Sequence, residues 1–98
     1  MTKVDILFIR TDEKVEGSIV DENDYIDHIK YLTNISKNRY FIGGGSLNNP
    51  GGMVVFSAKD IEEAKIICDK DPLILRGLYM YKLMIWEVVI INKNIDIK

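Results

Sequence analysis

One side chain in this sequence is the first candidate for acid–base chemistry near neutral pH. His28 is the only histidine among 98 residues, and it lies in the segment Tyr25-Ile-Asp-His-Ile-Lys-Tyr-Leu32. An imidazole titrates near neutral pH, so it takes up and returns protons at little cost. Asp71, which stands before Pro72, is a candidate carboxylate to orient that imidazole. Together they suggest a His–Asp pair, provided that the fold brings positions 28 and 71 together.

Each member of this pair also has an ordinary structural interpretation. A lone histidine beside an apolar helix face is more often a core residue with one hydrogen bond than a catalyst. An aspartate before a proline commonly ends a helix or forms a turn. The residues by themselves therefore leave both interpretations open, one catalytic and one structural.

Other kinds of site have weaker support. Gly43-Gly-Gly-Ser46 and Gly51-Gly52 do not match a phosphate-binding loop, because they join two expected strands and not a strand to a helix. One histidine and one cysteine, Cys68, make no metal-ligand cluster, and no metal is expected. A serine triad would require Ser46 or Ser57 to share the one histidine. The glycines are interpreted as a tight hairpin end that needs positive φ.

Composition narrows the class of protein. With 13 basic and 15 acidic residues the net charge is -2, which gives no basic surface for nucleic acid. A single cysteine is typical of a reducing compartment, and no apolar run reaches the roughly 20 residues that span a bilayer. We expect one cytoplasmic domain over residues 1–98, with no membrane partner and a polar tail from about residue 92.

Hydrophobic periodicity predicts the elements that must position the pair. An apolar, β-branched run is typical of a buried strand, and apolar residues at helical spacing indicate a helix. Asp60 with Glu63 resembles a capping box at the start of the second helix, and a short turn is expected after Pro72. In order, the expected elements are a strand over 4–9, a helix over about 22–37, a hairpin of strands 40–42 and 53–56, a helix from 60 to before 71, and a strand over 79–91.

This order, β-α-β-β-α-β, predicts an α+β fold: a ferredoxin-like sandwich of four antiparallel strands with both helices on one face. The other face of the sheet then has no cover. Both faces of the strand over 79–91 are largely apolar, since Tyr79, Tyr81 and Leu83 alternate with Met80 and Met84. Monomers seldom expose such a patch, so we expect a homodimer that packs sheet against sheet.

An ordered set of motifs then resembles the YCII-related family, within the dimeric α/β-barrel superfamily. The motifs cover residues 4 to 91, with Asn38-Arg39 where the family usually has Gly-Lys and with Gly43-Gly44-Gly45 where it usually has Gly-Pro. Their residues are His28-Ile-Lys-Tyr-Leu32, Phe41-Ile-Gly-Gly-Gly45, Gly51-Gly-Met-Val-Val-Phe56, Asp60-Ile-Glu-Glu-Ala64, Asp71-Pro72-Leu73 with Gly77-Leu78, and Ile85-Trp86-Glu-Val-Val89.

The resemblance implies a ferredoxin-like dimer whose site pairs the helix histidine with the Asp-Pro aspartate, here His28 and Asp71. It also implies proton-transfer chemistry, as a lyase or isomerase, on small cyclic or aromatic molecules. The leading hypothesis is a cofactor-free enzyme in which His28 is the base and Asp71 orients it. The expected pocket residues are Tyr25, Tyr31, Phe41, Gly44 and Ser46.

Two alternatives stay open. In the first, the protein is a non-catalytic ligand-binding or accessory homodimer, and the His28–Asp71 pair only locks helix to helix. In the second, it is a haem- or oxygen-using monooxygenase of the same superfamily. The sequence does not identify the substrate.

Overall fold

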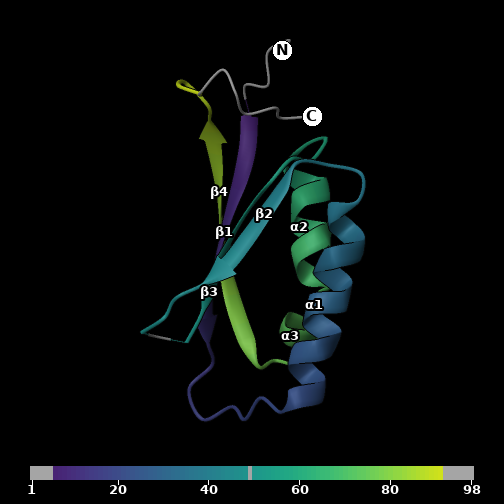
Figure 1. Ribbon diagram of the computed structural model, residues 1–98, viewed down its shortest axis with the longest axis vertical. Coiled ribbons are helices and arrows are strands. Elements are labelled where there is room, and N and C mark those ends of the chain that lie inside the picture. The colour runs from purple at the N-terminus through teal and green to yellow at the C-terminus, as the bar shows by residue number, and fades with distance from the viewer. Residues whose placement is uncertain (1–5, 49, 92–98) are drawn as a thin grey trace.

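A computed structural model describes residues 6–48 and 50–91 of the chain (Figure 1). The expected order of elements is present, and a short third helix follows Pro72 as predicted. The elements are β1 (Ile6–Lys14), α1 (Glu22–Ser36), β2 (Phe41–Gly45), β3 (Gly52–Phe56), α2 (Ile61–Asp69), α3 (Pro72–Leu75) and β4 (Tyr79–Glu87).

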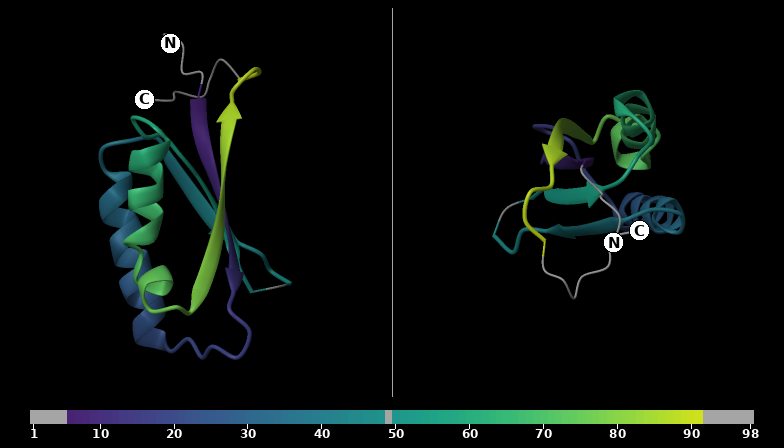
Figure 2. Two further views of the ribbon diagram at one scale, coloured as in Figure 1. Left: turned by 180° about the vertical axis from the view of Figure 1, so that it is seen from behind. Right: turned by 90° about the horizontal axis from the view of Figure 1, so that it is seen from above.

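The strands form one four-stranded sheet in the order β2-β3-β1-β4, and each neighbouring pair is antiparallel. All three helices cover the same face of this sheet, and Figure 2 shows the other face bare of helices. The predicted ferredoxin-like sandwich and the predicted β2–β3 hairpin are therefore confirmed. No helix in the described ranges is long and apolar enough to cross a membrane.

The main core lies between the sheet and α2. Phe8 and Phe56 on the sheet pack with their ring centroids 5.9 Å apart, against Ala64, Ile67 and Cys68 of α2. Leu32 and Ile35 of α1 pack against the edge of this cluster and stay only partly buried. Because α1 has no fully buried residue, space is left between it and the glycine-rich end of the sheet.

Local capping explains where both long helices begin. The Asp21 carboxylate accepts the amide of Asp24 at 2.8 Å, and the Asp24 carboxylate accepts the amide of Asp21 at 3.1 Å, a complete capping box. For α2 the predicted box is only half formed. Asp60 accepts the Glu63 amide, but the Glu63 carboxylate accepts the amide of Lys59, one residue before the cap.

The first strand is longer at its carboxyl end than the sequence suggested. The polar run from Arg10 to Lys14, which we expected to leave the sheet, continues as strand and pairs with β4 up to Lys14 opposite Tyr79. The prediction failed because pairing with β4 keeps this run in the sheet, and Arg10 and Asp12, which share the helix-bearing face, compensate each other's charge. Residues 4 and 5 lie outside the described part. The last strand ends at Glu87, and residues 88–91 are not strand.

Few of the hairpin glycines are needed for backbone conformation. Gly51 has φ +125°, whereas Gly43, Gly44, Gly45 and Gly52 do not have positive φ, so our interpretation of the whole run was wrong. A Cβ atom on Gly51 would lie 2.5 Å from the carbonyl oxygen of Asp12 in β1. Gly51 is therefore required both for its conformation and for the close approach of the hairpin to β1.

We expect Gly51→Ala to lower the free energy of unfolding by about 1–3 kcal/mol, because alanine is strained at this φ and collides with β1. Gly44→Ala is the matched control in the same hairpin, since a Cβ there meets nothing within 4 Å. Urea unfolding of both variants and the wild type measures the difference. Equal stabilities of the two variants would contradict this account of Gly51.

Candidate functional site

Asp71 is positioned by the junction between α2 and α3. It is the N-cap of α3, with extended backbone (φ -63°, ψ 130°), as expected of a residue before proline. Its side chain is fully buried, at 0% exposure. One carboxylate oxygen accepts the amide of Leu73 at 2.9 Å, so the capping role suggested by the sequence is present. That contact leaves the rest of the carboxylate available for other partners.

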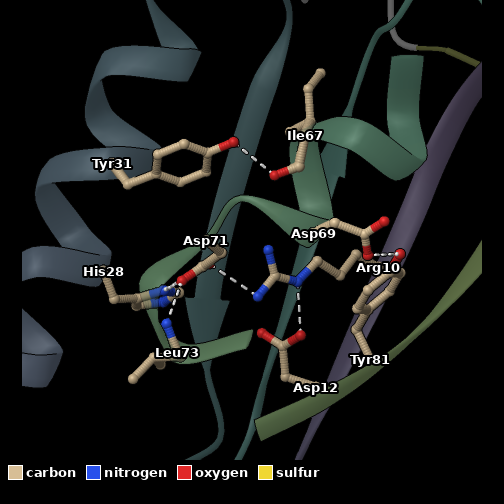
Figure 3. Close-up of polar contacts among 9 residues, drawn as sticks. All are labelled: Arg10, Asp12, His28, Tyr31, Ile67, Asp69, Asp71, Leu73 and Tyr81. Carbon is tan, nitrogen blue, oxygen red and sulfur yellow. Dashed lines mark hydrogen bonds and ion pairs between the residues drawn. The ribbon is translucent and has the colours of Figure 1, made fainter. Parts of the chain in front are cut away.

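His28 approaches this carboxylate from α1 (Figure 3). Its Nδ1 atom lies 2.7 Å from Asp71 Oδ2 and 2.9 Å from Oδ1. An ionised carboxylate only accepts hydrogen bonds, so Nδ1 carries the proton and the Nε2 lone pair is left unbonded by Asp71. No hydrogen bond to Nε2 is present among the described residues, and the side chain is 12% exposed. The ring is neither sealed in the core nor fully solvated.

Arg10 approaches Asp71 from β1 on the side opposite His28 (Figure 3). Its Nη2 atom lies 2.9 Å from Asp71 Oδ2, a charge contact without hydrogen-bond geometry, and its Nε donates to Asp12 Oδ1 at 2.6 Å. The Arg10 side chain is 1% exposed and its guanidinium carbon is 5.8 Å from the centre of the Tyr81 ring. One buried cation therefore neutralises part of the charge of two carboxylates.

These contacts decide the ionisation of Asp71. Burial alone raises the pKa of Asp71, but the His28 hydrogen bond and the charge of Arg10 outweigh it and hold this pKa below the ordinary 3.8. For Arg10, burial by itself lowers the pKa, but the hydrogen bond and charge of Asp12 outweigh burial and leave this pKa raised. The buried ion pair is therefore charged across the neutral range.

A cleft of about 440 Å³ opens beside this cluster, between α1 and the β2–β3 end of the sheet. His28, Tyr25 and Asp12 line it together with Phe41 and Tyr79. Its floor is glycine: the hairpin register places Gly43, Gly45 and Gly52 on the face of the sheet that carries the helices. The absence of side chains at these three positions is what leaves the cleft open.

The structure brings most of the predicted site residues to this cleft. Tyr25, Phe41 and Gly44 line it with His28, and Asp71 lies directly behind His28. Tyr31 does not line it: its hydroxyl donates to the carbonyl oxygen of Ile67 at 2.6 Å and ties α1 to α2 (Figure 3). Burial raises the pKa of Tyr31, so this phenol stays protonated.

Ser46 is also placed elsewhere. It follows β2 in the hairpin loop and borders a shallower neighbouring hollow with Gly44 and Gly45. Its hydroxyl oxygen accepts the amide of Asn48 at 3.2 Å. Strand β2 runs on to Gly45, three residues beyond the predicted end at Ile42, and this extension moves Ser46 past the cleft.

Sequence reasoning missed Arg10 and Asp12. The available signal was two opposite charges separated by one residue after an apolar run, which on a strand places both side chains on one face. Cys68 is buried, and burial raises the pKa of its thiol to about 11. The described residues include no group of three or more histidine, cysteine, aspartate or glutamate side chains placed to hold a metal ion.

No family model matches this chain, and no curated protein matches it in sequence. Among solved structures, the fold is similar to that of a 5-chloro-2-hydroxyhydroquinone dehydrochlorinase from Burkholderia phenoliruptrix, in complex with 2,5-dihydroxybenzoquinone. The TM-score is 0.69 at 22% sequence identity, over 82% of this chain and 92% of the other. This likeness shows a shared ferredoxin-like α/β fold.

The lowered pKa of Asp71 predicts how stability depends on acidity. A carboxyl whose pKa is lower in the folded chain than in the unfolded chain stabilises the fold above its unfolded pKa, and this contribution is lost as pH falls through the folded pKa. We expect the free energy of unfolding to decrease below about pH 4. The decrease should be smaller in Asp71→Asn, whose side chain does not titrate.

Urea unfolding at pH 7 and at several values below pH 4 measures this dependence. Glu62→Gln is the matched control, because it removes an exposed carboxylate of α2. It should keep the acid dependence of the wild type. An identical acid dependence in Asp71→Asn and the wild type would contradict the assignment.

Proposed function

We propose that this protein is a cofactor-free acid–base enzyme of the YCII-related type, acting as a lyase or isomerase on a small cyclic or aromatic molecule. The observation that carries the proposal is the His28–Asp71 contact of 2.7 Å at the wall of an open cleft. The shared fold with a dehydrochlorinase that acts on a substituted hydroquinone supports the same class of reaction. The ordered motifs from His28 to Trp86 support the family assignment.

In the proposed mechanism His28 Nε2 removes a proton from the bound ring. The electrons of the broken bond move into the ring, where they either shift a double bond or expel a leaving group. Asp71 holds Nδ1–H and stabilises the imidazolium that forms. The imidazolium then returns the proton to another ring atom in an isomerisation, or to water in an elimination, which regenerates the neutral base.

The size and lining of the cleft are consistent with such a ligand. A cleft of about 440 Å³ is in the range of small-molecule sites. Phe41 and Tyr25 offer aromatic surfaces for a ring, and the glycine floor allows the ligand to approach the backbone closely. His28 and Asp12 both line the cleft, and each contacts a member of the buried Arg10–Asp71 ion pair.

The non-catalytic alternative also has an observation in its favour. Asp71 contacts α1 through His28, β1 through Arg10 and α3 through the Leu73 amide. The pair could therefore serve only to fix α1 against the sheet. In that case removal of the imidazole should mainly destabilise the fold.

Replacement of His28 separates these two functions. We expect His28→Ala to reduce any catalysed proton transfer by at least about 100-fold, the usual contribution of a general base. Stability should fall by only about 1 kcal/mol, since Asp71 keeps Arg10 and the Leu73 amide. Deuterium exchange from heavy water into small hydroxylated rings, followed by NMR, measures the transfer, and thermal melting measures the fold.

Lys30→Ala is the matched control, an exposed position on the same helix. It should leave both exchange and melting unchanged. Exchange that survives in His28→Ala would refute the catalytic assignment. A large loss of stability in His28→Ala, with no exchange catalysed by the wild type, would favour the accessory function.

We further propose that the protein is a homodimer joined through the open face of the sheet. By the register of β1 and β4, Met80, Met84 and Trp86 lie on the face opposite the helices, and all three are exposed. Ile42 of β2 and Met53 of β3 extend this apolar surface across the sheet. An exposed apolar area on a helix-free sheet face is a favourable surface for a second copy.

A charge in this face should prevent association. Met84→Glu is expected to shift the species observed by light scattering at micromolar concentration from dimer to monomer, because it would bury an unpaired carboxylate in the contact. Ile66→Glu is the matched control: Ile66 and Met84 are both 52% exposed, but Ile66 lies on α2. A monomeric wild type would refute the dimer.

A further inference from the structure

The cleft carries a charge that the proposed His28–Asp71 chemistry does not use. Arg10 supplies one positive charge to two carboxylates, Asp12 and Asp71, so the cluster has an excess of one negative charge whenever His28 is neutral. All three side chains are at most 8% exposed. Water therefore screens this excess charge poorly, and it acts on whatever occupies the cleft.

Asp12 is the member of the cluster that reaches the ligand space. It lies near the end of β1, and its side chain lines the cleft together with His28. Oδ1 accepts the Arg10 Nε–H at 2.6 Å. Oδ2 has no hydrogen bond within the described residues, yet it is not among their fully buried unpaired atoms. This second oxygen is therefore an unpaired acceptor with some exposure, on a residue that lines the cleft.

Nothing positive balances this acceptor on the ligand side. Among the described residues that line the cleft there is no lysine or arginine, and the rest of the lining is mostly apolar or glycine. A ligand carboxylate placed there would lose its hydration and meet a second carboxylate at short range, which is unfavourable on both counts. A hydroxyl would instead satisfy the open oxygen, and a hydrogen bond to a charged acceptor is among the strong ones.

We propose that Asp12 is the ligand-selecting residue of the cleft: it accepts a hydrogen bond from a ring hydroxyl, so the cleft binds neutral hydroxylated rings and excludes rings that bear a carboxylate. This inference rests on the proposed function, in that a small ring molecule occupies the cleft. It adds the chemical class of that molecule. If Asp12 served only as a counterion for Arg10, its exchange for a neutral acceptor would leave ligand preference unchanged.

Two matched probes test this selection: hydroquinone and its carboxylated derivative gentisate, titrated by ligand-observed NMR at pH 7. The wild type is expected to bind hydroquinone about tenfold tighter than gentisate or better. In Asp12→Asn, hydroquinone should bind about tenfold more weakly, and the preference over gentisate should largely disappear. Asparagine keeps an Oδ1 acceptor for Arg10 Nε, and a melting curve verifies that the fold is retained.

If Asp12→Asn does not fold, a second variant tests whether the negative charge in the cleft disfavours a ligand carboxylate. Thr33 is an exposed residue of α1 that lines the cleft, so Thr33→Lys adds the missing cation at a position that tolerates it. Gentisate binding should then strengthen relative to hydroquinone binding, by up to about fivefold. No gain in gentisate binding would overturn the inference, as would an unchanged preference in a folded Asp12→Asn.

The failure of this inference is distinguishable from failure of the acid–base proposal. Wild-type protein that binds neither probe, or prefers gentisate, refutes the selection by Asp12. The acid–base proposal is decided by deuterium exchange and its loss in His28→Ala. Binding selectivity that depends on Asp12 in a protein without any exchange activity would retain the ligand class and reject the catalysis.

Discussion

The structure depends on one physical constraint: the carboxylate of Asp71 is ionised and has no contact with solvent. A buried charge must be paired or bonded on every side, since its loss of hydration costs several kcal/mol. Here α1 supplies His28, β1 supplies Arg10, and α3 supplies the Leu73 amide. These contacts fix the first helix and the first strand against the junction of the last two helices, and the same contacts assemble the candidate site.

The division of partners around Asp71 affects what His28 is free to do. Because Arg10 and a backbone amide also stabilise the carboxylate, the imidazole can gain or lose a proton without leaving Asp71 unpaired. The arrangement therefore separates charge compensation, assigned to Arg10, from proton transfer, assigned in our proposal to His28.

The parts of this architecture that local chemistry determines could be predicted from the sequence. Helical periodicity located α1 and α2, a capping motif located the start of α2, and turn residues located the hairpin. Arg10 and Asp12 could not be found in that way, because their charges argued for a loop while their pairing with β4 kept them in the sheet. The placement of Tyr31 was likewise decided by packing, since its hydroxyl reaches a carbonyl of α2 that periodicity does not reveal.

At the cleft, the strand propensity of the residues conflicts with the open space that the fold contains. Glycine is a poor strand residue, yet β2 ends with three and β3 begins with another. A Cβ atom on Gly52 would lie 2.7 Å from the carbonyl oxygen of Gly44, so close strand packing requires that glycine, whereas side chains at Gly43 and Gly45 would enter the cleft that His28 lines. The strands keep their register through backbone hydrogen bonds and through Phe41 opposite Phe56, outside the cleft floor. Gly43 and Gly45 therefore trade strand propensity for open space in the cleft.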